Sequence, residues 1–269
     1  MSAYFMIGAN TVKSTFTYRF HILFQTLTSA FRIIVQYFIW AAVFGATEGG
    51  LSSGTIHGMT FSQTFIYVSL AAAIGVLART WIDWDMNYQI RSGDIIMFLF
   101  KPVDYMKFMF SNSIGAMTGN FITITIPSLL VIFLFFHVSV PVGLNIVFFI
   151  IALAGSCALS FLFDFFIGTT CFWTLSVWGI SAAKDLIIAF LSGALIPLKF
   201  YPETISSLVV WLPFPYMYSL PLTILTSSSP APLEWLRGIG IQFAWIAVML
   251  FVVRKYFRFS LRKLTVNGG

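Results

Sequence analysis

The stretch that decides the fold class is LNIVFFIIALAGSCALSFLFDFFIG, residues 144–168, in which Asp164 is the one charged side chain. A helix needs about 20 apolar residues to cross roughly 30 Å of hydrocarbon, and this stretch exceeds that length. Membrane-spanning β-strands would instead show short segments of alternating polarity. Comparable apolar blocks recur at about 21–44, 61–81, 108–136, 183–200 and 236–257. The pattern therefore predicts an all-α integral membrane protein with six transmembrane helices.

The composition excludes a soluble globular domain. Of the 269 residues, 59% are hydrophobic and 9% are charged, and the mean hydropathy is +0.91. Soluble domains carry about 25% charged residues, and a domain of this size could not shield so much apolar surface from water. The net charge of +6 is compatible with nucleic-acid binding, but in a membrane protein the position of each charge is more informative than the sum.

Basic residues are concentrated on one side of the predicted membrane. Six spans place both termini on the same side, together with the connections 79–107 and 169–185. The basic residues on that side are Lys13, Arg19, Arg79, Arg91, Lys101, Lys107, Lys184, Arg254, Lys255, Arg258, Arg262 and Lys263. The opposite connections 45–60 and 137–143 contain no Lys or Arg. Because cytoplasmic loops are enriched in these residues, we expect both termini and the loop 82–105 in the cytoplasm.

Both ends of the chain have the composition of segments that lie along a membrane surface. In residues 1–20, apolar side chains recur at helical spacing, which predicts an interfacial helix. These side chains are Phe5, Ala9, Val12, Phe16 and Phe20. The stretch RKYFRFSLRKL, residues 254–264, interleaves basic and aromatic residues. Nucleic acid would also bind such a stretch, but beside a membrane span we favour anionic lipid headgroups as its partner.

Two predicted spans carry polar residues along one helical face. The first stripe consists of Gln25, Ser29, Arg32 and Gln36, and the second of Ser156, Ser160 and Asp164. A charged group at the centre of a bilayer costs at least about 2.5–3.5 kcal/mol, so Arg32 should face protein, a wet cavity or the headgroups. Asp164 is the natural candidate to pair with Arg32. Two interpretations of each stripe remain open, namely contact between helices and the lining of a translocation path.

A proline-rich segment interrupts the chain between the fifth and sixth predicted spans. LSGALIPLKFYPETISSLVVWLPFPYMYSLPLTIL, residues 191–225, is apolar but contains five prolines, and proline breaks helices. We therefore expect a broken, re-entrant or extracellular segment over 197–230. Irregular backbone at membrane depth must be buried in protein or line a cavity, which suggests a gate. An aromatic belt at the outer interface is the alternative. The residues assigned to the gate region are Gly193, Pro197, Pro202 and Pro213.

Two stretches resemble motifs of a known family. IRSGDIIMFLFKPVDY, residues 90–105, is similar to a cytoplasmic motif of the type-2 ATP-binding-cassette (ABC) exporter permeases, with Ser-Gly-acid, several apolar residues and a basic-Pro pair. The segment 191–225 is similar to the signature after their fifth span, in which a Gly precedes Pro-x-x-x-x-Pro and a later Leu-Pro-Phe. Lys199, just before the second proline, departs from the pattern. With the six-span layout, the chain resembles the six-span bacterial branch of this family over nearly its whole length.

The resemblance implies a function and a set of partners. A member would be a permease half that pairs with a second permease subunit, as a homodimer or heterodimer, and docks on cytoplasmic ABC ATPase subunits in a bacterial inner membrane. The chain has no Gly-x-x-x-x-Gly-Lys-Ser/Thr loop to hold phosphates, so ATP and Mg would bind the partner ATPase. We therefore expect ATP-driven export. The alternative is a secondary transporter driven by an ion gradient, which charged residues inside spans favour.

The loop between the second and third spans is where the family contacts its ATPase, through a short coupling helix. Carried onto this chain, the helix corresponds to DWDMNYQIRSGD, residues 83–94. Gly93 would end it and Pro102 would lead into the next span. The residues assigned to ATPase coupling are Asp83, Trp84, Asp85, Tyr88, Arg91, Gly93, Asp94 and Pro102. The alternative is that these charges only hold the protein at the inner membrane surface.

The other reactive residue types predict no metal or catalytic site. His21, His57 and His137 lie far apart at or near span ends, and Cys157 and Cys171 have few neighbours of metal-ligand type. No Ser, His and acid set lies at matching depth in the predicted spans. We therefore expect neither a metal nor a cofactor on this chain, and no enzymatic activity of its own.

Overall fold

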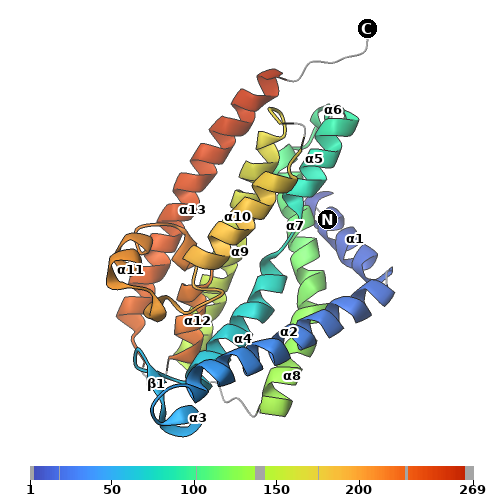
Figure 1. Cartoon of the computed structure of the whole chain (residues 1–269). Helices are drawn as coiled ribbons and strands as arrows, with labels where there is room; N and C mark the ends of the chain where they lie inside the picture. The colour runs from blue at the N-terminus through green and yellow to red at the C-terminus, as the bar shows by residue number, and fades with distance from the viewer. Residues whose placement is uncertain are drawn as a thin grey trace.

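The computed structural model describes residues 3–17, 19–100, 102–136, 143–174, 176–227 and 230–263. Lys101 and His137, which the sequence analysis uses, lie outside these ranges, and the side chains of Arg19, His21 and Lys263 are not described. Apart from one two-stranded hairpin, the regular structure in the described ranges is helical (Figure 1). The prediction of an all-α membrane protein is therefore confirmed at the level of fold class.

The first half of the chain contains α1 (Ala3–Thr17), α2 (Arg19–Gly45), α3 (Gly50–Ser53), α4 (Phe61–Ala78), α5 (Ile82–Ser92), α6 (Ile95–Leu99), α7 (Tyr105–Asn120), the π-helix η1 (Phe121–Thr125) and α8 (Ile126–Phe136). Strands β1 (Thr55–Ile56) and β2 (Met59–Thr60) pair antiparallel between α3 and α4. The second half contains α9 (Leu144–Thr170), α10 (Trp178–Leu191), η2 (Leu198–Phe200), α11 (Glu203–Val209), η3 (Phe214–Tyr216), α12 (Ser219–Thr226), α13 (Pro232–Ser260) and η4 (Leu261–Lys263).

Five helical segments in the described ranges are long and apolar enough to cross a membrane. They correspond to α2, α4 with its continuation, α7 to α8, α9 and α13. The span predicted over 183–200 is wrong as a long helix, because α10 has 14 residues, or about 21 Å of helix. Gly193 follows the helix with φ 79° and Pro197 follows soon after. A left-handed glycine and a proline together end a helix, and the chain continues in short pieces to α13 (Figure 1).

The third span bends around Pro127. A proline has no N–H to donate to the carbonyl four residues earlier, which here belongs to Thr123. The preceding segment Phe121–Thr125 is a π-helix, a geometry that often absorbs such a defect. The Thr26 hydroxyl of α2 lies 3.1 Å from the Thr123 carbonyl oxygen and donates to it. Ser29 and Ser128 share a buried hydrogen bond of 2.8 Å beside it, so α2 and the bent span are joined by polar contacts.

The N-terminal helix α1 packs along α7 at close backbone distance. Gly115 and Gly119 form a G-x-x-x-G pair on α7, the pattern that lets helices in membranes approach closely. A Cβ atom at Gly115 would lie 2.5 Å from the Gly8 carbonyl oxygen and 2.7 Å from Thr11. The Thr11 hydroxyl also donates to Asn112 at 2.6 Å. An N-terminal helix, which we predict over 1–20, is therefore present over Ala3–Thr17 and packs against α7.

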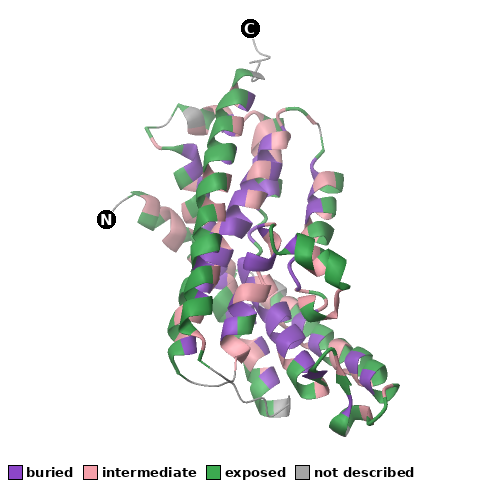
Figure 2. Cartoon of the chain, turned by 90° about the vertical axis from the view of Figure 1, so that its left-hand side faces the viewer, coloured by how far each residue is buried: buried purple, intermediate pink, exposed green. Residues whose placement is uncertain are grey.

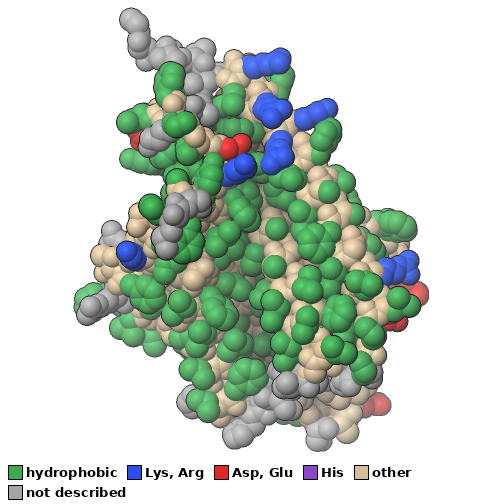
Figure 3. Space-filling view, turned by 180° about the vertical axis from the view of Figure 1, so that it is seen from behind, with side chains coloured by type: hydrophobic (Ala, Val, Ile, Leu, Met, Phe, Trp, Pro, Cys, Tyr) green, Lys and Arg blue, Asp and Glu red, His purple; other side chains and the backbone are tan. Residues whose placement is uncertain are grey.

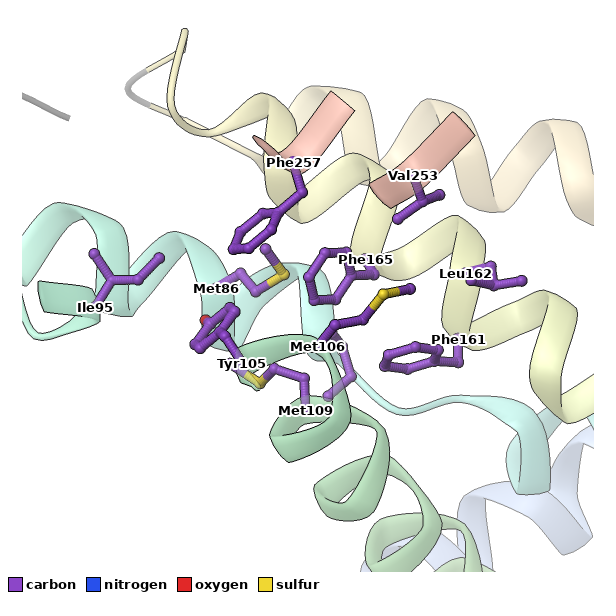
Figure 4. Close-up of a cluster of buried hydrophobic side chains, with 11 residues drawn as sticks. Met86, Ile95, Tyr105, Met106, Met109, Phe161, Leu162, Phe165, Val253 and Phe257 are labelled. Atoms are coloured by element: carbon purple, nitrogen blue, oxygen red, sulfur yellow. The ribbon is translucent and has the colours of Figure 1, made fainter. Parts of the chain in front are cut away.

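The largest buried cluster joins α5, α7, α9 and α13. Figure 4 shows Met86 of α5 beside Phe165 of α9, Phe257 of α13 and Tyr105 of α7. Tyr105 and Phe257 stack with ring centroids 5.6 Å apart. In contrast, the outer side of α13 is exposed along most of its length (Figure 2). The core therefore fixes the short helix α5 to three long helices, and the apolar outer faces are left for lipid or a partner.

Candidate functional site

The short helix α5 has one face in the core and one face open. Ile82 and Met86 are fully buried. Gly168 of α9 makes this packing possible, since a Cβ atom there would lie 2.7 Å from the Met86 sulfur. On the opposite side the exposed residues are Trp84, Asp85, Tyr88, Arg91 and Ser92. Four of the residues that the sequence assigns to coupling thus share a surface at one end of the molecule (Figure 1).

The ends of α5 follow the sequence prediction. Gly93 caps the helix in the left-handed conformation, with φ 80°, which is a frequent helix ending. The Ser92 hydroxyl donates to the Asp94 carboxylate at 2.7 Å, so Asp94 is used inside the turn. Pro102 is exposed ahead of α7, and the Asp104 side chain caps that helix by accepting from the Lys107 N–H at 2.9 Å.

Asp83, which we expect from the sequence to face a partner, instead points inward. It is 1% exposed. The Ser181 hydroxyl and the Lys184 ammonium of α10 both donate to its Oδ2 atom, the ammonium at 2.9 Å. The Trp84 backbone N–H donates to the Oδ1 atom at 3.0 Å. Asp83 is therefore part of an internal contact between α5 and α10.

Lys184 joins Asp83 to a second buried carboxylate. Its ammonium also pairs with Asp164 Oδ1 on α9, while the Thr80 hydroxyl donates to Asp164 Oδ2 at 2.9 Å. All of these groups are less than 10% exposed. Charge-assisted hydrogen bonds of this kind are stronger than neutral ones. Asp83, Lys184 and Asp164 are called the buried ionic triad below.

The connection between α4 and α5 is short and strained. Trp81 has φ 56°, a left-handed conformation that non-glycine residues adopt rarely and at a cost. The Arg79 guanidinium lies 4.3 Å from the centre of the Trp81 ring and pairs with Asp185 of α10 at 2.6 Å. This outer ion pair is partly exposed, with side chains 48% and 38% accessible. The Arg79–Asp185 pair thus forms a second contact between the α4–α5 connection and α10, which is weaker than the triad because it is exposed to solvent.

A cavity of about 700 Å³ lies next to the triad. Its walls come from α2, α4, α9, α10 and the segment before α12. Asp83, Asp164, Lys184 and Ser181 form part of its lining, and Arg32 lies on the α2 side. Most of the lining surface is apolar. The cavity is therefore an apolar hollow with a charged region where α5 and α10 meet.

The first polar stripe divides between two environments. Ser29 is buried against α8, whereas Arg32 and Gln36 line the cavity and Gln25 is half-buried. The Gln36 Oε1 atom is buried without a partner within the described part of the chain. The pairing of Arg32 with Asp164 that we expect does not form, because Asp164 binds Lys184 and Thr80. Lys184 is the residue that sequence reasoning missed, having counted it only as a cytoplasmic charge.

The second stripe also divides. Ser160 and Asp164 line the cavity, but Ser156 is fully buried and faces other helices. The Ser156 hydroxyl lies 2.9 Å from the Ala152 carbonyl oxygen and 3.3 Å from that of Tyr216. Gln242 of α13 donates to the same two oxygens, at 2.9 and 2.8 Å. At Ser156 the structure favours helix contact over a translocation path.

The residues that the sequence assigns to a gate are spread over the broken segment. Gly193, Pro197 and Pro213 are buried, and Pro202 is exposed at the start of α11. A Cβ atom at Gly193 would lie 3.1 Å from the Tyr67 hydroxyl of α4. The segment after α10 is thus packed against α4, and its next residues, Ala194 and Leu195, border the cavity.

Basic side chains gather at the end that carries α5 and the end of α13 (Figure 3). In the described ranges no group of three or more His, Cys, Asp and Glu residues is arranged to hold a metal ion. The apolar long helices, the basic end and the exposed face of α5 together describe a multi-pass membrane protein.

Comparison with known proteins agrees with this description. The sequence model of the family described as "ABC-2 family transporter protein" matches residues 20–268. No curated protein matches the chain. Proteins of this membrane permease family lack an ATPase domain and generally associate with ABC ATPase subunits. The chain therefore belongs to the ABC-2 family of transporter membrane proteins.

Proposed function

We propose that the chain is the membrane-spanning half of an ATP-driven export system in a bacterial cytoplasmic membrane. It couples ATP hydrolysis by a separate ATPase subunit to substrate efflux. The observation that carries this proposal is the exposed face of α5, where Trp84, Tyr88 and Arg91 are presented on a helix fixed to the core. Aromatic and arginine residues are the types enriched in protein interfaces. ATP and Mg bind the partner ATPase.

The proposal includes a six-crossing topology with both termini in the cytoplasm. Basic residues gather at the α5 end (Figure 3), which supports a cytoplasmic location for that end. α10 begins at this end and stops part of the way along the molecule (Figure 1). The short pieces from 192 to 226 then complete the fifth crossing. Such backbone is tolerated at membrane depth only when it is packed in protein or lines a cavity, as its contacts with α4 and α9 allow.

A second permease subunit completes the assembly. The outward side of α2 is unusually apolar and exposed, with Phe24, Phe31 and Phe38 each about two-thirds accessible. Arg32 lies on the same helix and opens into the cavity, a position in which a charge needs protein or water rather than lipid. We place the partner permease, either a second copy or a related chain, against this side.

The docking role of α5 is tested by replacing Trp84 and Arg91 with Ala together. A hot-spot residue of these types costs about 2 kcal/mol or more when it is truncated, so ATPase binding should weaken at least about 30-fold if one of the two is such a residue. Co-purification of the membrane complex measures the change. The matched control is the pair Trp211→Ala and Arg237→Ala, a Trp and an Arg that are exposed on other elements. Control and test variants should both insert in the membrane.

A transport assay in vesicles separates the proposal from its alternative. We expect efflux that requires ATP and that falls in the Trp84 and Arg91 variant but not in the control. Efflux that persists without ATP and stops when an ion gradient is dissipated would instead identify an ion-driven secondary transporter. Unchanged co-purification with unchanged transport in the double variant would remove α5 from the mechanism.

A further inference from the structure

The inward anchors of α10 are polar. Of its 14 residues, only Ser181 and Lys184 are buried, and both donate to Asp83 of α5. The apolar side chains of α10 divide between two environments: Ile180 and Ile188 are half-buried at the edges of buried clusters, whereas Trp178 is 68% and Leu186 72% exposed. The fully buried contacts between α10 and α5 are therefore hydrogen bonds and charges, with Ile180 and Ile90 beside them at the edge of one apolar cluster, whereas α5 packs on α9 through Ile82 and Met86.

Each carboxylate oxygen of the triad has a donor. Asp83 accepts from the Trp84 N–H on one oxygen and from Ser181 and Lys184 on the other. Asp164 accepts from Lys184 on one oxygen and from Thr80 on the other. Buried charges persist only when they are paired and hydrogen-bonded in this way. The Lys184 ammonium also lies 3.4 Å from the partly exposed Asp185. Because every carboxylate oxygen of Asp83 and Asp164 is already occupied by a donor of this chain, the triad reads as a joint between helices.

The triad ties together the elements that meet where α4 turns into α5. Thr80 belongs to the three-residue connection itself and is bonded to α9. Trp81, the next residue, holds a left-handed conformation of the kind that persists only when surrounding contacts enforce it. A displacement of α5 would therefore act directly on α9 and on α10, because the triad connects all three helices. The same three charged residues also line the cavity.

We propose that the buried ionic triad fixes α5 to α10, with Lys184 as the central positioning residue. When α5 moves, α10 and the charged region of the cavity therefore move with it. Without the triad, the movement of α5 would be taken up by bending of the α4–α5 connection alone. The inference rests on the proposed function for its purpose, because α5 is taken as the helix on which the ATPase acts. Asp83 accordingly serves an internal contact, and the partner meets the other face of α5.

The geometry is testable without any ATPase. The full chain, with Cys157 and Cys171 replaced by Ala, receives spin labels at the exposed positions Tyr88 of α5 and Leu186 of α10, and is reconstituted in lipid nanodiscs. Pulsed electron paramagnetic resonance then gives the distance distribution between the two helices. In Lys184→Met we expect this distribution to become about twofold wider, because two buried carboxylates lose their shared ammonium.

Two further variants show that the effect belongs to the triad. Asp185→Asn, one residue further along α10, removes the exposed pair with Arg79 and a longer contact of 3.4 Å with Lys184. Because both buried hydrogen bonds of the Lys184 ammonium remain, it should widen the distribution much less than Lys184→Met. The combination Asp83→Asn, Asp164→Asn and Lys184→Met removes all three charges, so no unpaired charge is buried. This neutral variant should recover a folded protein and still give the wide distribution.

The outcomes are decisive in either direction. A distribution in Lys184→Met or in the neutral variant that is as narrow as in the parent protein overturns the proposal. The same holds if Asp185→Asn widens it equally. If the distances behave as expected but the Trp84 and Arg91 variant still binds the ATPase and transports, the proposed function fails and the joint remains. In the assembled transporter, Lys184→Met should hydrolyse ATP with a severalfold lower yield of transport per ATP.

Discussion

We predict that mutations of Gln242 and Ser156 have coupled effects on the free energy of unfolding, because each side chain can partly replace the other as a hydrogen-bond donor. The two side chains donate to the same pair of carbonyl oxygens, those of Ala152 and Tyr216, from α13 and α9. The Gln242 amide has two hydrogens and reaches both oxygens, while the Ser156 hydroxyl has one hydrogen for two acceptors. Gly155 leaves the room that the Gln242 side chain occupies, since a Cβ atom there would overlap it.

The expected losses in the free energy of unfolding follow from the number of side-chain donors that each variant leaves for the two carbonyl oxygens. Ser156→Ala leaves both carbonyls served by Gln242, so it should cost less than about 1 kcal/mol. Gln242→Leu removes two hydrogen bonds and leaves one hydroxyl for two acceptors, which should cost about 1–3 kcal/mol. In the double variant neither oxygen has a side-chain donor. The loss should exceed the sum of the single losses by about 0.6–1.7 kcal/mol, the range of such couplings in membranes.

The assay is a double-mutant cycle on unfolding in mixed detergent micelles, followed by tryptophan fluorescence. The cycle isolates the shared contact from the general effect of each substitution. Losses that add within about 0.3–0.5 kcal/mol would refute the reasoning, because that is how independent sites behave. Ser160→Ala, which borders the cavity on the next turn of α9, is the control and should show no coupling to Gln242→Leu.

Two other outcomes follow from close contacts. Gly115→Val should push α1 off α7, because a Cβ atom there meets Gly8 and Thr11, and it should abolish a disulfide crosslink between Thr11→Cys and Asn112→Cys. Gly240→Val, where a Cβ atom meets nothing within 4 Å, should keep the crosslink, and its survival in both would contradict the packing. Lys184→Met should lower the free energy of unfolding by about 3–5 kcal/mol, against about 0–1 kcal/mol for Asp185→Asn. Equal losses in denaturation curves would disprove the burial argument.

The long helices could be predicted from the sequence, and the fifth span could not. α9 and α13 are continuous apolar runs of sufficient length, so composition alone identifies them. The block 183–200 is also mostly apolar, but Gly193 takes φ 79° and Pro197 follows. A hydropathy profile does not record the backbone conformations that glycine and proline favour, and these conformations are what ends the helix there. Proline spacing predicted a broken segment, yet it placed the break later than the structure does.

The site was predicted in part for a similar reason. Trp84 and Tyr88, which we assign to coupling from the sequence, are exposed on α5, whereas Met86 on its other face is buried. Asp83 lies between the two faces, and its ammonium partner is 101 residues away. Periodicity within one helix carries no information about such a partner. Lys184 therefore entered the sequence analysis only as one basic residue among several.

The bend at Pro127 constrains how the chain can enter the membrane. The Thr123 carbonyl, to which the proline cannot donate, lies 3.1 Å from the Thr26 hydroxyl of α2, whose one hydrogen is shared with the Ile22 carbonyl at 2.9 Å. In hydrocarbon, an unsatisfied carbonyl costs several kcal/mol, so the third span is poorly suited to stand alone in lipid. α2 precedes it in the chain, so insertion in sequence order would bring α2 into the membrane first. The order of the helices along the sequence would thus give the bent span its partner at the moment of its own insertion.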